Sequence, residues 1–584
     1  MKKVINSPES VVDELCRGFA MVHNDVENLA RYRVLKKKTL NPDKVSLISG
    51  GGSGHEPAHA GFVGRGMLDA AVCGDVFASP SQIQVYQAIK AAAGRRGTLL
   101  IIKNYSGDVM NFQNAAFLAE TDGLEVDYVK VSDDIAVMDS LYTVGRRGVA
   151  GTVFVHKVAG AAAEAGGSLA EVKRLAQKAA DSVRSVGFAF TSCTVPAKGS
   201  PTFTLAEDEM EYGVGIHGEP GIRREKILSA DAMAERMIAS VAGDLGLAAG
   251  AEAAVLVNGF GATPLQELYI IAQAVGRELS ALNIGMFRFF VGNYMTSIDM
   301  AGVSLSLMAM DDELKTLLAA KCDAPAFKVD GNESPVRYLP PETRAGTIAE
   351  PVVDADVSGG GDKVAGDAIG YDNLVFLVDK MSEIIIRNEA AFSELDSHAG
   401  DGDFGASVAK GFKQLKREWA AVLAAGRGDM GAFLDACSLI IMEHCGGASG
   451  PIWGIAFKYA AKATAGKSRL TVGDVAEMLR SAVAGIQAVG ERSFGRGAVV
   501  GDKTLIDALI PCADAWAACR DKGAPMAEAF RKGAEAAVAG AKSTEAIVAR
   551  MGRAGVVGER SIGHPDAGAH ALGVIFTELA RSLK

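Results

Sequence analysis

The first half of the chain alternates short apolar runs with longer amphipathic stretches. The apolar runs are rich in β-branched residues and have the length of buried strands. They are Val45–Ser49, Leu99–Lys103, Val126–Val131, Thr152–Val158, Ala254–Val257 and Val303–Met308. Helix-length stretches such as Ser81–Ala93 and Leu265–Leu282 separate several of these runs. This alternation predicts an α/β domain whose sheet is largely parallel and covered by helices.

The hydrophobic pattern disappears between residues 334 and 364. This segment contains four prolines, which are followed by the sequence Ser-Gly-Gly-Gly. Proline and glycine at this density, without apolar periodicity, are typical of a linker between domains. We therefore predict a first domain over residues 1–333, a linker over residues 334–364 and a second domain over residues 365–584.

After the linker, apolar residues recur at steps of three and four positions. The first such stripe consists of Leu374, Leu377, Val378, Met381, Ile384 and Ile385. Alanine-rich stretches of helical length follow at Phe433–Glu443, Val475–Val489, Leu505–Cys519 and Met526–Ala541. Because no strand pattern of comparable strength appears, we predict an all-α second domain, arranged as a helical barrel or bundle.

Composition and charge narrow the class of protein. The 584 residues carry a net charge of −10, spread along the chain, which argues against a general affinity for nucleic acid or membranes. The eight cysteines show no metal-binding spacing, so we expect reduced thiols and a cytoplasmic protein. The sequence has neither a signal peptide nor an apolar run of about 18 residues, so we expect no membrane anchor. The 68 glycines exceed the usual share and predict loops where the backbone approaches a ligand closely.

Three polar loops, two of which follow predicted strands, supply candidate chemistry in the first domain. Gly50–Pro57 follows a strand and carries His55, Asp108 comes shortly after the next strand, and His217 lies between glycines. Ligands of open α/β sheets bind at the carboxyl ends of the strands, so these side chains are expected to share one crevice. Together they form a possible set of acid, base and nucleophile. A tight turn with His55 as a cap, and helix capping by Asp108, are the structural alternatives.

The second domain carries a carboxylate loop and a glycine-rich helix start. Asp396, Asp401 and Asp403 have glycines among them and cannot share one helix face, which favours a loop that wraps hard cations. Gly446–Pro451 opens a helical stretch, where backbone N–H groups can cradle an anion. Together these motifs predict Mg²⁺ and a nucleotide phosphate, with enough carboxylates for two ions. A solvated acidic turn and an ordinary helix–helix corner are the alternatives.

Weaker signals follow in the same domain. Gly501–Thr504, Gly552–Arg553 and Gly563–Ala569 are short segments that contain glycine, and such segments are usually helix caps or turns. Arg553 could nevertheless offer a guanidinium group to a nucleotide.

Seven motifs follow one another in a distinctive order. In the first domain they are Gly50–Ser81, Lys103–Phe112 and Gly215–Gly221, and in the second they are Asp396–Gly405, Gly446–Gly454, Gly501–Leu509 and Gly558–Ala569. This set resembles the dihydroxyacetone kinase family. The resemblance is to the single-chain ATP-dependent form, in which a ketose-binding K domain precedes a nucleotide-binding L domain. It covers nearly the whole chain except the linker.

The resemblance implies an enzyme that phosphorylates dihydroxyacetone with ATP. Another short ketose or aldose, such as erythrulose or glyceraldehyde, is the alternative substrate. The resemblance further implies that His217 binds the substrate carbonyl as a hemiaminal, that Asp108 and His55 act as acid and base, and that the enzyme is a homodimer. The implied substrate-binding residues are Gly52, Ser53, Gly54, His55, Lys103, Asp108 and His217.

For the nucleotide side, the resemblance implies ATP and two Mg²⁺ ions, with Asp396, Asp401 and Asp403 as metal ligands. The implied nucleotide-binding residues are Phe404, Gly405, Ala406, Ser407, Ala448, Ser449, Gly497, Arg553, Asp566 and Gly568. Phe404 and Ala567 depart from the family pattern, in which a histidine and an Asp-Pro-Gly sequence are common at these places. Both departures concern the nucleotide end of the site and leave the metal ligands intact.

Two relatives of this enzyme are alternative interpretations. One is the form that a phosphotransferase system recharges, but its K and L domains are separate chains, whereas here they are fused. The other is a ketose sensor without enzymatic activity, which the intact His217, Asp108 and metal-binding aspartates argue against.

Overall fold

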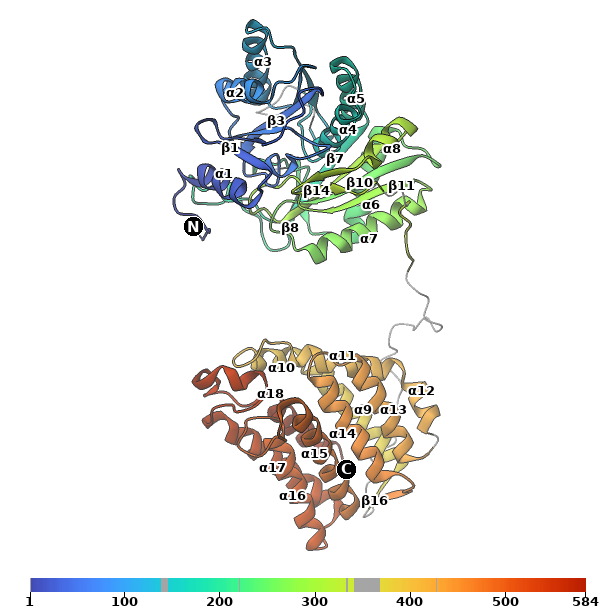
Figure 1. Ribbon diagram of the computed structural model, residues 1–584. Coiled ribbons are helices and arrows are strands. Elements are labelled where there is room, and N and C mark those ends of the chain that lie inside the picture. The colour runs from blue at the N-terminus through green and yellow to red at the C-terminus, as the bar shows by residue number, and fades with distance from the viewer. Residues whose placement is uncertain are drawn as a thin grey trace. The chain divides into compact units, whose positions relative to one another are not determined.

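The structure, a computed structural model, describes residues 2–137, 145–219, 221–331, 335–340, 368–426 and 428–583, without the side chains of Arg553 and Val556. The chain forms two compact units, Met1–Glu342 and Thr343–Lys584 (Figure 1). Residues 341–367, which make up most of the predicted linker, lie outside the described residues. The domain boundaries at residues 334 and 364 therefore stay predictions.

One sheet of the first unit contains the strands predicted around the first glycine loop. It has six strands in the order β1-β2-β4-β3-β5-β6. Their bounds are β1 Val26–Leu29, β2 Val34–Lys37, β3 Ser46–Ser53, β4 Ala70–Val76, β5 Thr98–Lys103 and β6 Val126–Val131. β4, β3, β5 and β6 run parallel, whereas β1 and β2 add an antiparallel edge. The prediction of a largely parallel sheet is thus confirmed, and the carboxyl ends of β3 and β5 are neighbours.

A second sheet, also with six strands, has the order β11-β10-β12-β7-β8-β9. Its strands are β7 Val183–Ala189, β8 Glu209–Tyr212, β9 Arg223–Lys226, β10 Glu252–Gly259, β11 Gly285–Gly292 and β12 Gly302–Ala309. Only β10 and β11 pair parallel in it. The apolar pattern predicts β10 and β12. A fully buried strand is continuously apolar in a parallel and in an antiparallel pair, so the pattern does not predict their antiparallel pairing. A small hairpin of β13 (Cys322–Ala324) and β14 (Phe327–Val329) follows.

Helices cover both sheets in layers (Figure 1). They are α1 Val11–Val22, α2 Gln82–Ala92, α3 Ser106–Thr121, α4 Thr152–Glu164, α5 Leu169–Asp181, α6 Ala230–Leu245, α7 Leu265–Ala281 and α8 Asp312–Ala319. α2 and α3 share an apolar core with one face of the first sheet, and α6 and α7 share another with one face of the second. The opposite faces of both sheets contribute to a central core, which also contains α4 and α5.

The prediction of a strand at Thr152–Val158 is wrong, because this segment begins the helix α4. Every residue from Thr152 to Ala163 is buried. A helix enclosed on all sides shows no polar face, so its β-branched apolar start imitates a buried strand. The helix packs closely against the loop before β4, since a Cβ on Gly160 would lie 2.1 Å from the carbonyl oxygen of Gly66.

The second unit is helical, as predicted. Its helices are α9 Tyr371–Arg387, α10 Glu389–Asp396, α11 Phe404–Arg417, α12 Trp419–Gly426, α13 Met430–His444, α14 Ser449–Thr464, α15 Val472–Phe494, α16 Ile506–Asp521, α17 Met526–Ser543 and α18 Ala567–Ser582. A short antiparallel pair, β15 (Ala368–Gly370) with β16 (Arg469–Thr471), precedes α9 and α15. The helices surround an apolar cavity, lined among others by Leu377, Phe457 and Phe576, as in a helical barrel. Within the described ranges, no helix has both the length and the apolar character that a membrane crossing requires.

Candidate active site

The carboxyl end of β3 brings the first glycine loop next to Lys103. The strand continues through the glycines to Ser53, because residues without side chains allow β4 and β5 to come close. A Cβ on Gly50 would lie 2.4 Å from the carbonyl oxygen of Val72, and one on Gly51 would lie 2.9 Å from the ammonium nitrogen of Lys103. Gly50 therefore allows close packing against β4, and Gly51 makes room for a buried lysine at the strand end.

His55 and His217 face each other beside the carboxyl end of β3. Their Nε2 atoms are 3.2 Å apart, and Nδ1 of His55 lies 2.8 Å from the carbonyl oxygen of Thr296. Because a carbonyl oxygen only accepts hydrogen bonds, Nδ1 of His55 carries the proton and its Nε2 is the acceptor in the neutral ring. Nε2 of His217 therefore donates to His55, which places a base next to a potential nucleophile.

Burial keeps both imidazole rings neutral. Desolvation lowers the pKa of His55 well below its ordinary value of 6.5, and the charge of Lys103 adds to this effect. Desolvation also lowers the pKa of His217, with His55 and Lys103 contributing. Phe77 stacks on His55 with 5.1 Å between ring centroids, and Tyr105 meets His217 edge to face at 4.4 Å. The aromatic rings thus restrict the orientation of both histidines, and His217 is available as a neutral imidazole whose Nε2 proton His55 can accept.

Lys103 and Asp108 form a buried ion pair near the histidines. Lys103 ends β5, and Asp108 lies in the first turn of α3. The ammonium nitrogen is 4.0 Å from Oδ2 of Asp108, and both side chains are buried. Burial raises the pKa of Asp108, which the charge of Lys103 opposes, and burial lowers the pKa of Lys103. Tyr105 occupies the N-cap position of α3, so the capping role considered for Asp108 is not observed.

The loop that carries His217 is held by a buried arginine that belongs to no sequence motif. Arg147 donates hydrogen bonds to Asp134 at 2.6 Å, to Glu219 at 2.9 Å and to the carbonyl oxygen of Gly213 at 2.9 Å. Glu219 in turn accepts a hydrogen bond of 2.8 Å from the backbone N–H of His217. Arg147 and Glu219 are therefore positioning residues for His217. Glu219 lies within the motif Gly215–Gly221, whereas sequence reasoning missed Arg147 because its partners come from other parts of the chain.

The other implied substrate residues shape the backbone at the end of β3. A Cβ on Gly52 would lie 2.7 Å from the backbone nitrogen of Ala78. The hydroxyl of Ser53 donates to a carbonyl oxygen of β4 at 2.7 Å, and the N–H of Gly54 donates to the Glu56 carboxylate at 3.0 Å. The structure thus brings Gly52–Gly54 together with Lys103 and the histidines in one region.

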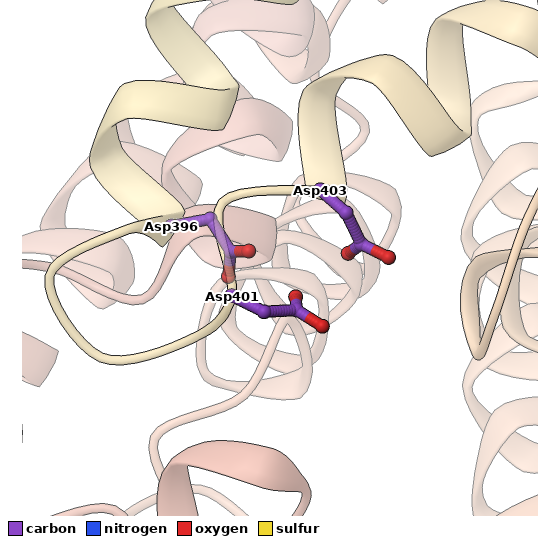
Figure 2. A group of neighbouring side chains, drawn as sticks. All are labelled: Asp396, Asp401 and Asp403. Atoms are coloured by element: carbon purple, nitrogen blue, oxygen red, sulfur yellow. The ribbon is translucent and has the colours of Figure 1, made fainter. Parts of the chain in front are cut away.

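The three implied metal ligands gather on the loop between α10 and α11. Figure 2 shows Asp396 at the end of α10, Asp403 at the start of α11 and Asp401 between them, with the carboxylates on one side of the loop. One carboxylate oxygen of each lies within 4.8 Å of the others. Burial raises the pKa of Asp396, two backbone hydrogen bonds oppose the rise, and the charges of Asp401 and Asp403 add to it. Three carboxylates at this spacing fit a hard divalent cation, which relieves their repulsion.

The carboxylate loop borders a pocket that includes the first residues of three helices. Its lining contains Phe404 at the start of α11, Ser449 at the start of α14 and Gly568 at the start of α18. The N-cap residues of α11 and α14 supply no side-chain cap, but in α11 the N–H groups of Phe404 and Ala406 donate to the side chains of Asp396 and Ser393. The start of α14 is therefore the more open of the two. Free N–H groups and the positive end of the helix dipole make such starts binding sites for phosphate groups. A cation site beside this pocket is an arrangement that suits a polyphosphate.

Known proteins combine the same two sites in one chain. Residues 17–326 match the Dak1 domain, and residues 398–581 match the DAK2 domain. D-erythrulose kinase of Mycolicibacterium smegmatis is 34% identical over 585 residues, which cover 99% of this chain and 98% of that protein. The chain belongs to the dihydroxyacetone kinase family. It is a kinase of this family that carries its K and L domains on a single polypeptide.

Two further dihydroxyacetone kinases are similar to this chain. The crystal structure of the dihydroxyacetone kinase from C. freundii in complex with AMP-PNP and Mg²⁺ has a TM-score of 0.60 and 29% identity, and the match covers 100% of this chain and 99% of that one. The dihydroxyacetone-binding subunit DhaK of PTS-dependent dihydroxyacetone kinase 1 from Listeria innocua is 52% identical over 314 residues, which cover 54% of this chain and 95% of the subunit.

In this member of the dihydroxyacetone kinase family, the pocket includes several of the implied nucleotide residues. They are Phe404, Ala448, Ser449, Asp566 and Gly568, together with the metal-site residues Asp396 and Asp403. Ala567 also lines the pocket, so both departures from the family pattern, Phe404 and Ala567, lie where the ligand is expected. Burial raises the pKa of Asp566, the N-cap of α18, to about 7.

Other implied nucleotide residues do not line the pocket. These are Gly405, Ala406, Ser407 and Gly497. Gly405 packs against α10, where a Cβ would lie 2.0 Å from the carbonyl oxygen of Glu389. The side chain of Arg553 is outside the described part of the chain, so its contact with a nucleotide stays a prediction.

Proposed function

We propose that this chain is an ATP-dependent dihydroxyacetone kinase, which transfers the γ-phosphoryl group of ATP to a substrate held covalently on His217. The observation that carries the proposal is the pair of neutral imidazoles, His55 and His217, with their Nε2 atoms 3.2 Å apart. The similarity to the C. freundii dihydroxyacetone kinase and to the dihydroxyacetone-binding subunit from Listeria innocua supports the choice of ketose.

The histidine pair supplies the groups that hemiaminal formation needs. Nε2 of His217 attacks the carbonyl carbon, so that a C–N bond forms and the C=O double bond becomes a C–O single bond. The proton of His217 Nε2 moves to Nε2 of His55 and from there to the former carbonyl oxygen, which leaves a neutral adduct. Glycerol has no carbonyl group and cannot form this bond, so the pair would select a ketose over a polyol.

Asp108 is the proposed base for phosphoryl transfer. It accepts the proton of the substrate hydroxyl as that oxygen bonds to the γ-phosphorus, while the bond from the γ-phosphorus to the β–γ bridging oxygen breaks and ADP leaves. Its raised pKa makes Asp108 a stronger base than an exposed aspartate, and Lys103 favours its ionised form. General bases of this kind typically contribute about 10²- to 10⁴-fold to the rate.

Asp396, Asp401 and Asp403 are the proposed ligands of Mg²⁺, which we expect as two ions. Mg²⁺ neutralises the charge of a triphosphate and of the transferring phosphoryl group. The start of α14, whose N-cap residue supplies no side-chain cap, would donate backbone N–H groups to the phosphate oxygens. The crystal structure of the C. freundii kinase in complex with AMP-PNP and Mg²⁺ supports this part of the proposal.

Another short ketose is the second candidate substrate. The identity of 34% with D-erythrulose kinase over almost the whole chain favours erythrulose. The same histidine pair would bind any small ketone, so the walls of the site decide between the two. We also propose, from the family resemblance, a cytoplasmic homodimer, for which sedimentation of the purified protein is the direct test of the oligomeric state.

A substrate panel tests the proposed function. The purified chain is assayed for Mg-ATP consumption with dihydroxyacetone, glyceraldehyde, D- and L-erythrulose and glycerol. We expect turnover with dihydroxyacetone and none with glycerol, and turnover with erythrulose alone would favour the second candidate. Comparable turnover with glycerol would contradict the hemiaminal.

The covalent step has its own measurement. With dihydroxyacetone labelled at carbon 2 with ¹³C, binding should move the carbon resonance from the carbonyl region to that of a tetrahedral carbon. His217→Ala should abolish this change, whereas His23→Gln, a substitution in a partly exposed histidine of the same unit, should not. A signal that stays in the carbonyl region with the unaltered protein would refute the covalent role of His217.

A further inference from the structure

Lys503 lies in a strained and buried position beside the nucleotide-side pocket. It belongs to the loop between α15 and α16, its backbone has a φ of +61°, and it is one of the pocket-lining residues. Its exposed fraction is only 2%. A residue other than glycine in the left-handed region costs free energy, and such strain concentrates at functional sites.

The ammonium group of Lys503 is surrounded by backbone carbonyl oxygens. It lies 2.5 Å from the oxygen of Ser561, 2.7 Å from that of Thr544, 2.8 Å from that of His564 and 3.3 Å from that of Ile547. An ammonium group has three N–H donors, so the three short contacts use all of them. Proteins bind potassium ions in a similar way, with backbone carbonyl oxygens that replace the hydration shell of the ion.

All four carbonyls come from the segment that connects α17 with α18. This segment, residues 544–566, contains only single turns of 3₁₀ helix, and its residues Met551, Gly552 and His564 line the pocket. Besides the bonds to Lys503, three hydrogen bonds among its described residues close the segment on itself. They run from the N–H of Gly563 to the carbonyl oxygen of Glu545 at 2.9 Å, from the N–H of Ala549 to the hydroxyl of Ser561 at 3.0 Å and from the N–H of Asp566 to the hydroxyl of Thr544 at 2.8 Å. Lys503 therefore gathers a wall of the pocket that has little regular secondary structure of its own.

We propose that Lys503 is a positioning residue that acts as a built-in monovalent cation, which folds the 544–566 segment into a wall of the nucleotide pocket. It rests on the proposed function, because it takes this pocket to be the nucleotide-binding site. The ammonium does not contact a phosphate group, because its three N–H donors are already used by carbonyl oxygens.

The test replaces the ammonium and then supplies a cation from solution. Lys503→Met keeps the length of the side chain and removes its charge, and Lys522→Met, at an exposed lysine after α16, is the matched control. Amide hydrogen exchange of peptides from residues 544–566 should become faster in Lys503→Met only. Ammonium or potassium ions at about 0.1 M should slow it again, whereas tetramethylammonium at the same ionic strength should not, because it is too large and has no N–H donor.

The kinetic readout is the split between KM and kcat. In Lys503→Met the KM for Mg-ATP should rise about tenfold or more, with a smaller change in kcat, and ammonium should lower this KM selectively. A direct role on the transferring phosphate would instead lower kcat with KM unchanged, and this result would overturn the proposal. Equal effects of ammonium and tetramethylammonium on hydrogen exchange would overturn it as well.

The outcome is readable even if the variant is unstable or the proposed reaction fails. If Lys503→Met does not fold, the same cations are compared for their ability to restore its thermal transition, and a gain that is selective for ammonium and potassium supports the proposal, whereas its absence overturns it. If the unaltered chain consumes no ATP, the proposed function fails, but the exchange measurement still decides the role of Lys503.

Discussion

The buried histidine His156 makes the stability of the first unit dependent on pH. Its ring lies in α4, is fully buried, and has its centroid 5.2 Å from that of His59. Neither ring nitrogen has a hydrogen-bond partner among the described residues. Burial, together with the charge of Lys103, lowers the pKa of His156 from 6.5 to about 3. Folding therefore requires the neutral ring over a range of pH in which the unfolded chain binds a proton.

The magnitude follows from this shift. Below pH 6.5 the unfolded state holds more protons than the folded state, so stability falls as the pH falls and is fully present above that value. At about pH 5, roughly 1.5 units below the pKa of the ring in the unfolded chain, protonation stabilises the unfolded state. The free energy of unfolding is therefore lower by about 2 kcal/mol than at pH 8. His55, His59 and His217 also have lowered pKa values, so the whole unit should lose more than this amount.

His156→Leu isolates the contribution of one ring. The variant should lose about 2 kcal/mol less than the unaltered protein between about pH 8 and pH 5, because leucine does not titrate. His23→Gln, at a partly exposed histidine, serves as the control. Denaturant unfolding is followed by circular dichroism, which reports on both units, and by tryptophan fluorescence, which reports on the helical unit alone because all three tryptophans lie there. An identical pH dependence in His156→Leu and the unaltered protein would refute a lowered pKa for His156.

Three further changes should have specific effects. Arg147→Met breaks a buried ion pair and should lower the free energy of unfolding of the first unit by about 3–5 kcal/mol, as measured by denaturation. Gly405→Ala should weaken Mg²⁺ binding, measured by calorimetry, because its Cβ would meet the carbonyl oxygen of Glu389 at 2.0 Å. Asp401→Ala should abolish Mg-ATP turnover while the circular dichroism spectrum is retained, and full activity in this variant would exclude the proposed metal site.

The sequence predicts most of the fold where local patterns and tertiary structure agree. The amphipathic stripe that begins at Leu374 and the alanine-rich stretches after it form helices because one face of each is buried in a single core. The prediction fails at α4. This helix is buried on all sides, so its sequence lacks the contrast between an apolar and a polar face by which a helix is recognised. It also misses short strands such as β8 and β9, because four residues are too few to show a period.

The sequence predicts those residues of the candidate site that lie in loops with a distinctive composition. Glycine-rich sequence points to His55 and His217, and three aspartates among glycines point to the loop between α10 and α11. Arg147 belongs to no motif, and Lys503 lies in the motif Gly501–Leu509 without a sign of its role, because their partners are brought to them by the fold: the carbonyl oxygens around Lys503 belong to residues 41 to 61 positions further along the chain. The meaning of such residues lies in tertiary contacts that no local pattern encodes.

The two candidate sites draw their residues from separate units, each with its own apolar core, and this has a genetic consequence. A mutation that damages one site leaves the fold of the other intact, so mutations in the two halves of the gene should act independently of each other. An inactive His217→Ala protein still has its carboxylate pocket, and an inactive Asp401→Ala protein still has its histidine pair. A mixture of the two would regain activity only if phosphoryl groups pass between different chains, so complementation in a test tube would report whether a molecule of this kinase works alone or with a neighbour.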